Sequence, residues 1–256
     1  MNLSFSTRGW QDRPWETWLD WAETMRFGGV ELYNVQSCPQ LTDRGGPLHK
    51  YSAAATVRAL REKNICIPCL DSSCDLTDEA SVETVRGLIR LAHEIQCPNV
   101  CAAALRDDDA AVHAALQALL GEAEAAGVTI LLKTSGIYAD TARLRALLDA
   151  FACDGLGALW DMHHPYRDHG ESADTTIKNL GAYVRHVHLR DSEDNGSYTI
   201  LGEGTLPAAS MMKALSSIDY DGFISIEWKP EWMADLDDLP LLREPHPGRG
   251  QTGPGS

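Results

Sequence analysis

The sequence has little positive charge. Its 256 residues include 22 lysine and arginine residues against 37 aspartate and glutamate residues, for a formal net charge of −15. Proteins that bind a nucleic-acid backbone need a basic surface, so this composition argues against DNA, RNA and anionic membranes as partners. A small anionic substrate remains compatible, because the local charge of a cleft can oppose the net charge.

Long apolar runs and paired cysteine clusters are also missing. The segment MNLSFSTRGWQDR lacks a basic stretch followed by an apolar one, and no segment approaches the ~18 uninterrupted apolar residues of a membrane span. The seven cysteines are scattered; Cys66 and Cys69 form CIPC, but no second pair completes a zinc site. Reduced thiols in buried strands are expected, which favours a cytoplasmic protein.

Eight short apolar runs are present, spaced by about 30 residues, the period of a βα unit. They cover residues 2–7, 29–34, 65–72, 99–105, 128–135, 156–162, 184–191 and 222–228. The runs are nearly continuous rather than alternating, which is typical of parallel strands buried on both faces.

The stretches between the runs have helical periodicity. In residues 77–96, Val82, Val85, Leu88, Ile89, Ala92 and Ile95 lie on one helical face. Similar helices are expected at 47–64, 109–126, 172–182 and 207–218. Asp12 and Pro14 predict the start of the first helix, and Asp140 is expected to cap the helix that follows it.

Eight such units close most simply into a single (β/α)₈ barrel, an α/β fold. A doubly wound open sheet is the alternative, and the absence of GxGxxG after the first strand makes it less favoured. The eighth helix could only lie at 232–243, where Pro240 interrupts it. We therefore expect a barrel over 1–243 with a short or incomplete final helix and a Pro/Gly-rich, disordered tail over 244–256. A piece of a longer protein is the other interpretation.

Polar residues recur where the predicted strands end. In a parallel barrel the carboxyl ends of all strands open on one face, so these side chains can converge. A single acid there is usually a solvated loop charge, but six strands with the same feature indicate a site. The candidates are Glu31, Asp71, Lys133, Asp161 with His163 and His164, His188 with Asp191, and Glu227 with Lys229. A carboxylate, an imidazole and a second carboxylate, from Asp161, His188 and Glu227, could bind one divalent cation.

The segments GVELY, LWDMHHPY, HVHLRDS, GEGTLP and GFISIEW resemble those of the xylose-isomerase-like TIM-barrel superfamily. That superfamily includes sugar (phosphate) isomerases and epimerases, inosose dehydratase and endonuclease IV. The resemblance implies a divalent metal (Mn²⁺, Mg²⁺, Co²⁺ or Zn²⁺) with Asp161, His188 and Glu227 as ligands. It also implies that His164 contacts the substrate.

The family mechanism implied by the resemblance is proton transfer beside a carbonyl group, through an enediolate that the metal stabilises. Two glutamates on strands 5 and 8 exchange the proton, and Glu227 can be one of them. The other is missing: Lys133 stands in its place, and no acid lies between Ala125 and Ala139.

Three alternatives follow from Lys133. It could replace the metal by pairing with Asp161 and Glu227; it could be a neutral amine that acts in catalysis. The site could also bind metal weakly through three ligands and be catalytically impaired. A protonated lysine beside a divalent cation is electrostatically unfavourable.

Four further residues are candidates for substrate binding. Glu31 and Asp71 could bind sugar hydroxyls, with structural ion pairs as the alternative. Glu203, in the Gly-rich loop 192–207, could reach into the barrel mouth. Lys229 is preferred over Arg190 for a phosphate or carboxylate.

The sequence thus predicts a sugar isomerase or epimerase that acts on a polyhydroxylated carbonyl compound, with Glu227, His164 and Lys133 as catalytic candidates. The alternatives are an inosose-dehydratase-like lyase and a catalytically degenerate sugar-binding barrel. An endonuclease-IV-like repair enzyme is disfavoured by the net charge of −15. A homodimer is compatible with the resemblance.

Overall fold

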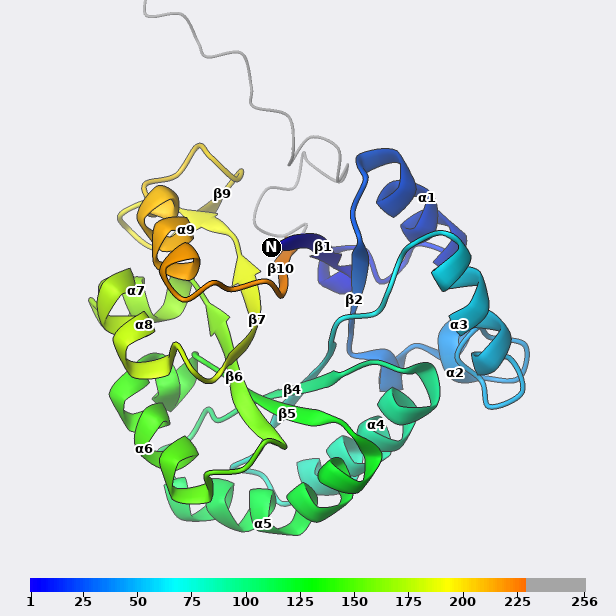
Figure 1. Cartoon of the computed structure of the whole chain (residues 1–256), viewed down its shortest axis with the longest axis horizontal. Helices are drawn as coiled ribbons and strands as arrows, with labels where there is room; N and C mark the ends of the chain where they lie inside the picture. Colours follow the sequence, from blue (N-terminus) through cyan, green and yellow to red (C-terminus); the bar gives the residue numbers. More distant parts are fainter. Residues whose placement is uncertain (229–256) are drawn as a thin grey trace, which may run out of the picture.

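Eight parallel strands close into a barrel with helices around it (Figure 1). The computed structural model describes residues 1–228. Around the barrel the strand order is β1-β10-β7-β6-β5-β4-β3-β2. The (β/α)₈ barrel predicted from the sequence is therefore confirmed, and the open doubly wound sheet is wrong.

The barrel strands are β1 (Asn2–Ser6), β2 (Gly29–Tyr33), β3 (Leu70–Asp75), β4 (Asn99–Ala103), β5 (Thr129–Lys133), β6 (Leu156–Asp161), β7 (Val184–Leu189) and β10 (Phe223–Ile226). The strands β8 (Asp191–Ser192) and β9 (Tyr198–Thr199) form a separate antiparallel hairpin. The α-helices are α1 (Trp15–Met25), α2 (Pro39–Thr42), α3 (Ala53–Glu62), α4 (Ala80–Ile95), α5 (Asp109–Ala126), α6 (Thr141–Phe151), α7 (His163–Arg167), α8 (Ala173–Leu180) and α9 (Ala208–Ser217). Short 3₁₀ helices span Thr7–Gly9, Val35–Ser37 and Gly136–Ala139.

Local chemistry explains where these elements begin and end. The Asp140 side chain accepts hydrogen bonds from the backbone N–H groups of Ala142 and Arg143, so the predicted cap of α6 is confirmed. The predicted cap at Asp12 is wrong: α1 begins at Trp15, directly after Pro14, which makes no side-chain cap. The third strand begins at Leu70 rather than residue 65, because Pro68 has no N–H to give to the sheet.

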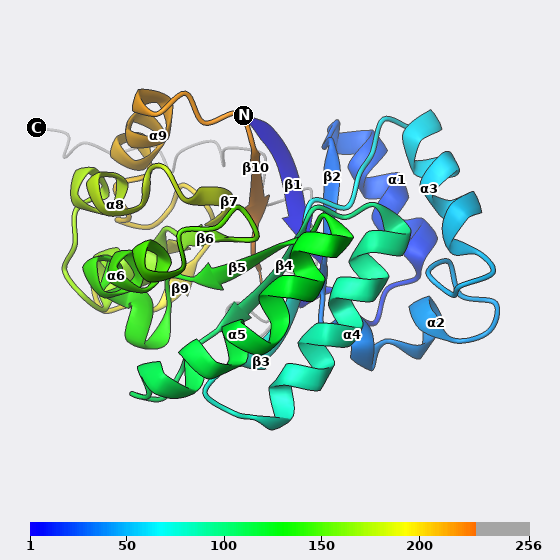
Figure 2. The same cartoon turned by 60° about the horizontal axis from the view of Figure 1, so that its bottom comes forward.

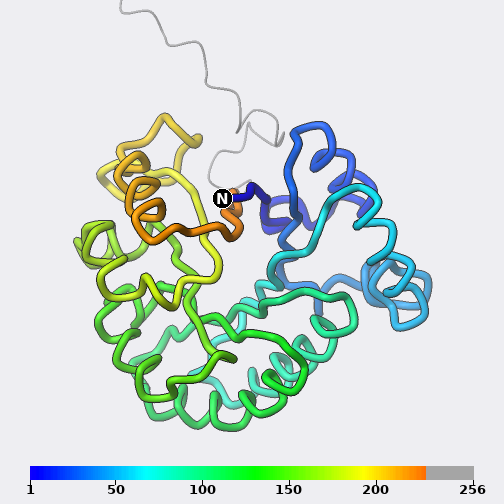
Figure 3. Tube along the Cα trace, in the orientation of Figure 1, coloured from blue at the N-terminus to red at the C-terminus, as the bar shows by residue number. Residues whose placement is uncertain are grey.

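The chain winds once around the barrel, so that its first and last described strands meet (Figure 3). Asn2 to Phe5 of β1 pair in register with Phe223 to Ile226 of β10. Figure 2 shows α4 and α5 lying side by side outside β3, β4 and β5, and these two helices contact each other closely. None of the helices in residues 1–228 is long and apolar enough to cross a membrane.

The inward-facing side chains divide the barrel interior into two halves. On one side, Cys69, Cys101, Leu131 and Leu159 form a small apolar cluster of their own, separate from the main core. On the other side, Ser4, Glu31, His186, His188 and Ser225 are all fully buried and hydrogen-bonded to one another. We call these two sets the apolar half and the polar half of the interior.

The predicted final helix at 232–243, the predicted tail and Lys229 lie outside the described residues. The domain boundary at residue 243 is therefore still a prediction.

Candidate functional site

A pocket of about 450 Å³ opens at the carboxyl ends of the barrel strands. This is the face on which barrel enzymes carry their active sites. Gly136 lines it with a positive φ, and a side chain there would collide with the carbonyl group of Ala104, so the loop after β5 requires glycine. The lining residues are Arg8, Tyr33, Asp71, Ser73, Ala103, Leu105, Lys133, Ser135, Gly136, His164, Arg190 and Tyr198.

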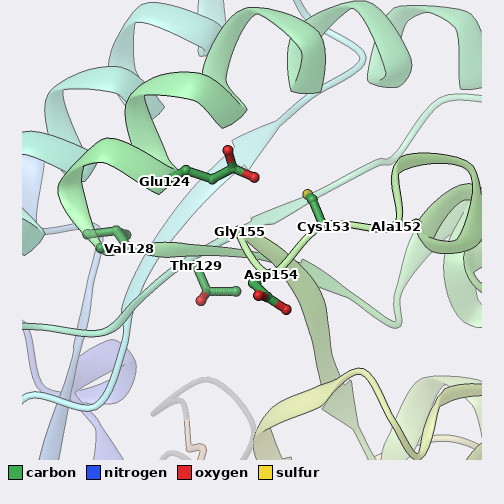
Figure 4. Close-up of a pocket in the computed structure, with 8 residues that line it drawn as sticks. Glu124, Val128, Thr129, Ala152, Cys153, Asp154 and Gly155 are labelled. Atoms are coloured by element: carbon green, nitrogen blue, oxygen red, sulfur yellow. The ribbon is translucent and has the colours of Figure 1, made fainter.

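A larger hollow of about 630 Å³ lies at the other end of the barrel strands (Figure 4). It is lined by the end of α5 and by the residues that lead into β5 and β6, among them Glu124, Thr129 and Cys153. None of the strand-end residues singled out from the sequence lines it. We therefore place the candidate site at the smaller, carboxyl-end pocket.

Arg190 is the central cation of this pocket. Its guanidinium donates through Nη2 to Asp161 Oδ2 and through Nη1 to Glu227 Oε2, the latter at 2.7 Å. Arg8 donates to the other Glu227 oxygen, Oε1, at 2.5 Å. Burial alone would raise the pKa of Glu227, but Arg190 and His188 outweigh it and hold that pKa well below its usual range.

Lys133 points into the same pocket from the end of β5. Its Nζ donates to Asp71 Oδ2 at 2.7 Å, with both side chains buried. Burial disfavours the charged form, but the carboxylates of Asp71 and Glu227 outweigh it and raise the pKa of Lys133. The ion pair with Asp71 therefore favours the charged ammonium over the neutral amine. The alternative that paired Lys133 with Asp161 and Glu227 is corrected: Asp71 is its partner, and Arg190 takes the two other acids.

Glu31 lies beneath the pocket and does not line it. Its Oε2 accepts from His186 Nε2 at 2.5 Å and from His188 Nε2 at 2.9 Å. Burial would raise the pKa of Glu31, but His188 and His186 hold it well below its usual range. Glu31 in turn raises the pKa of His188 against the effect of burial. These contacts fix the two histidines from a layer below the pocket.

His164 is the imidazole most open to the pocket. It lies on α7, and Asp168 follows four residues later, so both point from the same side of this short helix. His164 Nδ1 donates to Asp168 Oδ2 at 2.5 Å, and its Nε2 lies 3.8 Å from Asp161 Oδ2. In the neutral imidazole whose Nδ1 donates to this carboxylate, Nε2 carries the lone pair, which is the form that a general base requires.

The β8–β9 hairpin covers one side of the pocket. The Tyr198 ring lies 5.0 Å from the Arg190 guanidinium and 4.7 Å from the His163 ring. Arg167 donates to the Ser192 carbonyl group and to Thr205 Oγ1, both at 2.7 Å, which ties the hairpin to α7. Burial and Arg190 lower the pKa of His163 to about 4, which keeps this histidine neutral in its packing role. Glu203 is exposed and does not line the pocket.

The side chains present here do not fit a divalent metal ion. The atoms of Asp71, His188 and Glu227 lie within 4.8 Å of one another, so a metal could in principle be held, and His188 Nδ1 has no hydrogen-bond partner among residues 1–228. All three pocket carboxylates, however, are already paired with cations of the chain: Asp71 with Lys133, Asp161 with Arg190, and Glu227 with Arg8 and Arg190. A divalent ion would have to displace these pairs and then lie beside three positive charges.

The structure brings together most of the residues predicted from the sequence. Asp71, Lys133 and His164 line the pocket, and Asp161, His188 and Glu227 lie buried at its floor. Sequence reasoning missed Arg8, Asp168, Tyr198 and the role of Arg190. A signal existed for Arg190: it is two residues after His188, and the period of two in a strand puts both side chains on one face.

Comparisons with known proteins agree with this architecture. The family model described as xylose isomerase-like TIM barrel matches residues 19–247. A D-tagatose 3-epimerase-like protein is 18% identical with a TM-score of 0.72, covering 90% of this chain and 91% of its own. A probable 3-DHS dehydratase, AsbF, from Bacillus anthracis is 16% identical with a TM-score of 0.73, covering 89% and 93%.

The IolI protein, described with a bound zinc atom, is 17% identical with a TM-score of 0.77, covering 94% of both chains. No curated protein matches the sequence. At these identities the solved structures establish the fold alone. The family model spans most of the sequence, and this chain therefore belongs to the xylose isomerase-like TIM barrel family.

Proposed function

We propose that this barrel is a sugar isomerase or epimerase that moves a proton beside the carbonyl group of a polyhydroxylated compound, without a metal ion. One observation carries the proposal: His164, held by Asp168, faces a pocket lined by the cations Arg8, Lys133 and Arg190. A base opposite fixed positive charge is what proton abstraction next to a carbonyl requires. The likeness to epimerases supports the same reaction class.

The proposed steps use only side chains of this chain. His164 Nε2 takes the proton from the carbon beside the carbonyl group, and the C–H electrons form an enediolate. Lys133 and Arg190 donate hydrogen bonds to the negative oxygen, in a buried setting where such bonds are strong. His164 returns the proton to the neighbouring carbon, and the hydroxyl proton passes to the former carbonyl oxygen, which gives the isomer. The epimer requires that the Lys133 ammonium protonate the opposite face of the original carbon. We assign Asp71, which lines the pocket from β3, to binding a substrate hydroxyl.

Glu227, the catalytic candidate favoured by the sequence, has a different part in this proposal. It is bound by Arg8 and Arg190 and its pKa is held low, so it is a weak base. We assign it to holding those two guanidinium groups in place. We assign Asp161 likewise to holding the Arg190 guanidinium in place, and Asp161 also lies near His164.

The test is deuterium exchange. The protein is incubated in D₂O with a panel of keto-sugars, sugar phosphates and inosose, and NMR follows deuterium entry beside the carbonyl group. We expect exchange with the natural protein and a loss of about 10²-fold or more in His164→Gln, as for removal of a general base. His169→Gln, an exposed histidine that does not line the pocket, is the matched control. Exchange that survives in His164→Gln would refute its role as the base.

A second candidate function is sugar binding without catalysis. The pairing of all three pocket carboxylates with cations favours it, because none of them is free to act as a base. This function predicts saturable thermal stabilisation by a sugar with no exchange and no product. Loss of one water from the substrate, seen by mass spectrometry, would indicate the lyase alternative.

A further inference from the structure

We infer that this barrel carries its own cations where a divalent metal ion would otherwise bind, with Arg190 between Asp161 and Glu227 and Lys133 against Asp71. The inference does not depend on the proposed function, because it concerns what the pocket floor can bind in the absence of any substrate. It rests on contacts and charge at five buried side chains.

Arg190 lies between the carboxylates of Asp161 and Glu227, as a bridging cation would. One guanidinium nitrogen donates to Asp161 and another to Glu227, so a single planar group joins the ends of β6 and β10. Planar guanidinium groups match two carboxylates well. A metal ion would have to contact the same oxygens at about 2.0–2.6 Å. Arg190 and an ion therefore compete for the same atoms.

The Lys133 ammonium occupies the other part of the space in which a metal ion would lie. Asp71, His188 and Glu227 are the group of possible ligands that faces the pocket, and the Lys133 ammonium lies 2.7 Å from Asp71 Oδ2. Lys133 can reach Asp71 because β4, which lies between β5 and β3, ends with the small residue Ala103 at the pocket. An ion bound by this group would lie beside a buried positive charge.

The charges also balance without an ion. Three cations, Arg8, Lys133 and Arg190, face three carboxylates, Asp71, Asp161 and Glu227. A divalent ion would leave the buried pocket with an excess of two positive charges, which an interior tolerates poorly. The change Lys133→Glu makes the local charge more negative by two units, which would offset the two positive charges of the ion. That substitution supplies both the missing ligand and the missing charge.

The experiment measures bound Mn²⁺ in the full-length protein. The natural chain, Lys133→Glu and the double variant Lys133→Glu/Arg190→Met are incubated with Mn²⁺, desalted and assayed for metal by mass spectrometry and by electron paramagnetic resonance. We expect almost no Mn²⁺ in the natural chain and at least about tenfold more in the double variant, since both competing cations are gone. Lys178→Glu, an exposed position on α8 with the same charge change, should behave like the natural chain.

Two results would overturn the inference. The first is a natural chain that retains roughly one Mn²⁺ per molecule and loses thermal stability when a chelator removes it. This arm needs no variant and so does not depend on how a variant folds. The second is a double variant that is folded by circular dichroism, binds no more Mn²⁺ than the natural chain and gains no thermal stability from it. The first result would also contradict the metal-free form of the proposed function. The role of His164 as the base is tested separately, by deuterium exchange in His164→Gln.

Discussion

The two halves of the barrel interior reach the same degree of burial by different means. In the apolar half, Leu131 and Leu159 exclude water and fill space. In the polar half, Ser4 Oγ lies 2.7 Å from Ser225 Oγ, which in turn lies 2.9 Å from His186 Nε2, next to Glu31. An apolar layer tolerates exchange of one hydrocarbon for another, whereas a buried polar network depends on every partner. The polar half is also the one that supports His188 at the pocket floor.

The largest expected effect is the loss of Glu31. We expect Glu31→Ala to lower the free energy of unfolding by about 3–5 kcal/mol, because it leaves two buried imidazoles without their shared acceptor. Glu31→Gln retains an acceptor oxygen and should cost clearly less. Urea unfolding of the three proteins tests this. If Glu31→Ala lowered the free energy of unfolding by less than about 1 kcal/mol, the polar half would not depend on its individual partners more than the apolar half does.

A somewhat smaller effect is expected in the apolar half. Leu131→Ala leaves a cavity among Cys69, Cys101 and Leu159 and should cost about 3 kcal/mol. Leu131→Met, which conserves volume, should cost less than about 1.5 kcal/mol. The same urea series provides the measurement, and equal costs for both variants would contradict a packing role.

The smallest effect, and the one that separates the halves most cleanly, is the response to acid. The pKa of Glu31 is lower in the folded protein than its ordinary value of 4.5, so the unfolded chain takes up the proton first as the pH falls. The stability that Glu31 contributes is present above about pH 4.5 and is lost as the pH falls through the folded pKa. Glu31→Gln should therefore lose less stability than the natural chain below pH 4.5.

Leu131→Ala is the control for this acid series. It should run parallel to the natural chain at every pH, since it changes no titrating group. The pKa of His163 is lowered in all three proteins. Its protonation therefore adds the same loss of stability to each as the pH falls from about 6.5 to about 4. If the free energies of unfolding of Glu31→Gln and of the natural chain changed with pH in parallel, the acid response would come from groups other than Glu31.

The sequence was enough to predict the barrel and the approximate positions of its strands, except the third. Near-continuous apolar runs at a regular spacing admit few folds, and α5 was predicted with the bounds that it has, Asp109–Ala126. The third strand was misplaced because its apolar run begins before Pro68, and only the need for a backbone N–H moves the strand beyond it.

The pairing of charges could not be predicted in the same way. Periodicity assigns Asp71, Lys133 and Asp161 to one face, but it does not state which acid a long lysine side chain reaches. That depends on the small residue Ala103 of β4 between β5 and β3, and on Arg190 competing for Asp161. Arg8 was missed because it follows the first strand, more than 200 residues from its partner Glu227.

The seam between β1 and β10 has a consequence for synthesis of the protein. Contacts that join its two sides include the Arg8–Glu227 ion pair, the Ser4–Ser225 hydrogen bond and the ladder from Asn2 to Phe5. At about 5–20 residues per second, a ribosome needs roughly 10–45 s to make the chain between them. During that time one edge of β1 has no strand beside it, and an open strand edge can pair with another molecule. Nascent chains of this barrel should therefore depend on chaperones until residues 223–226 emerge.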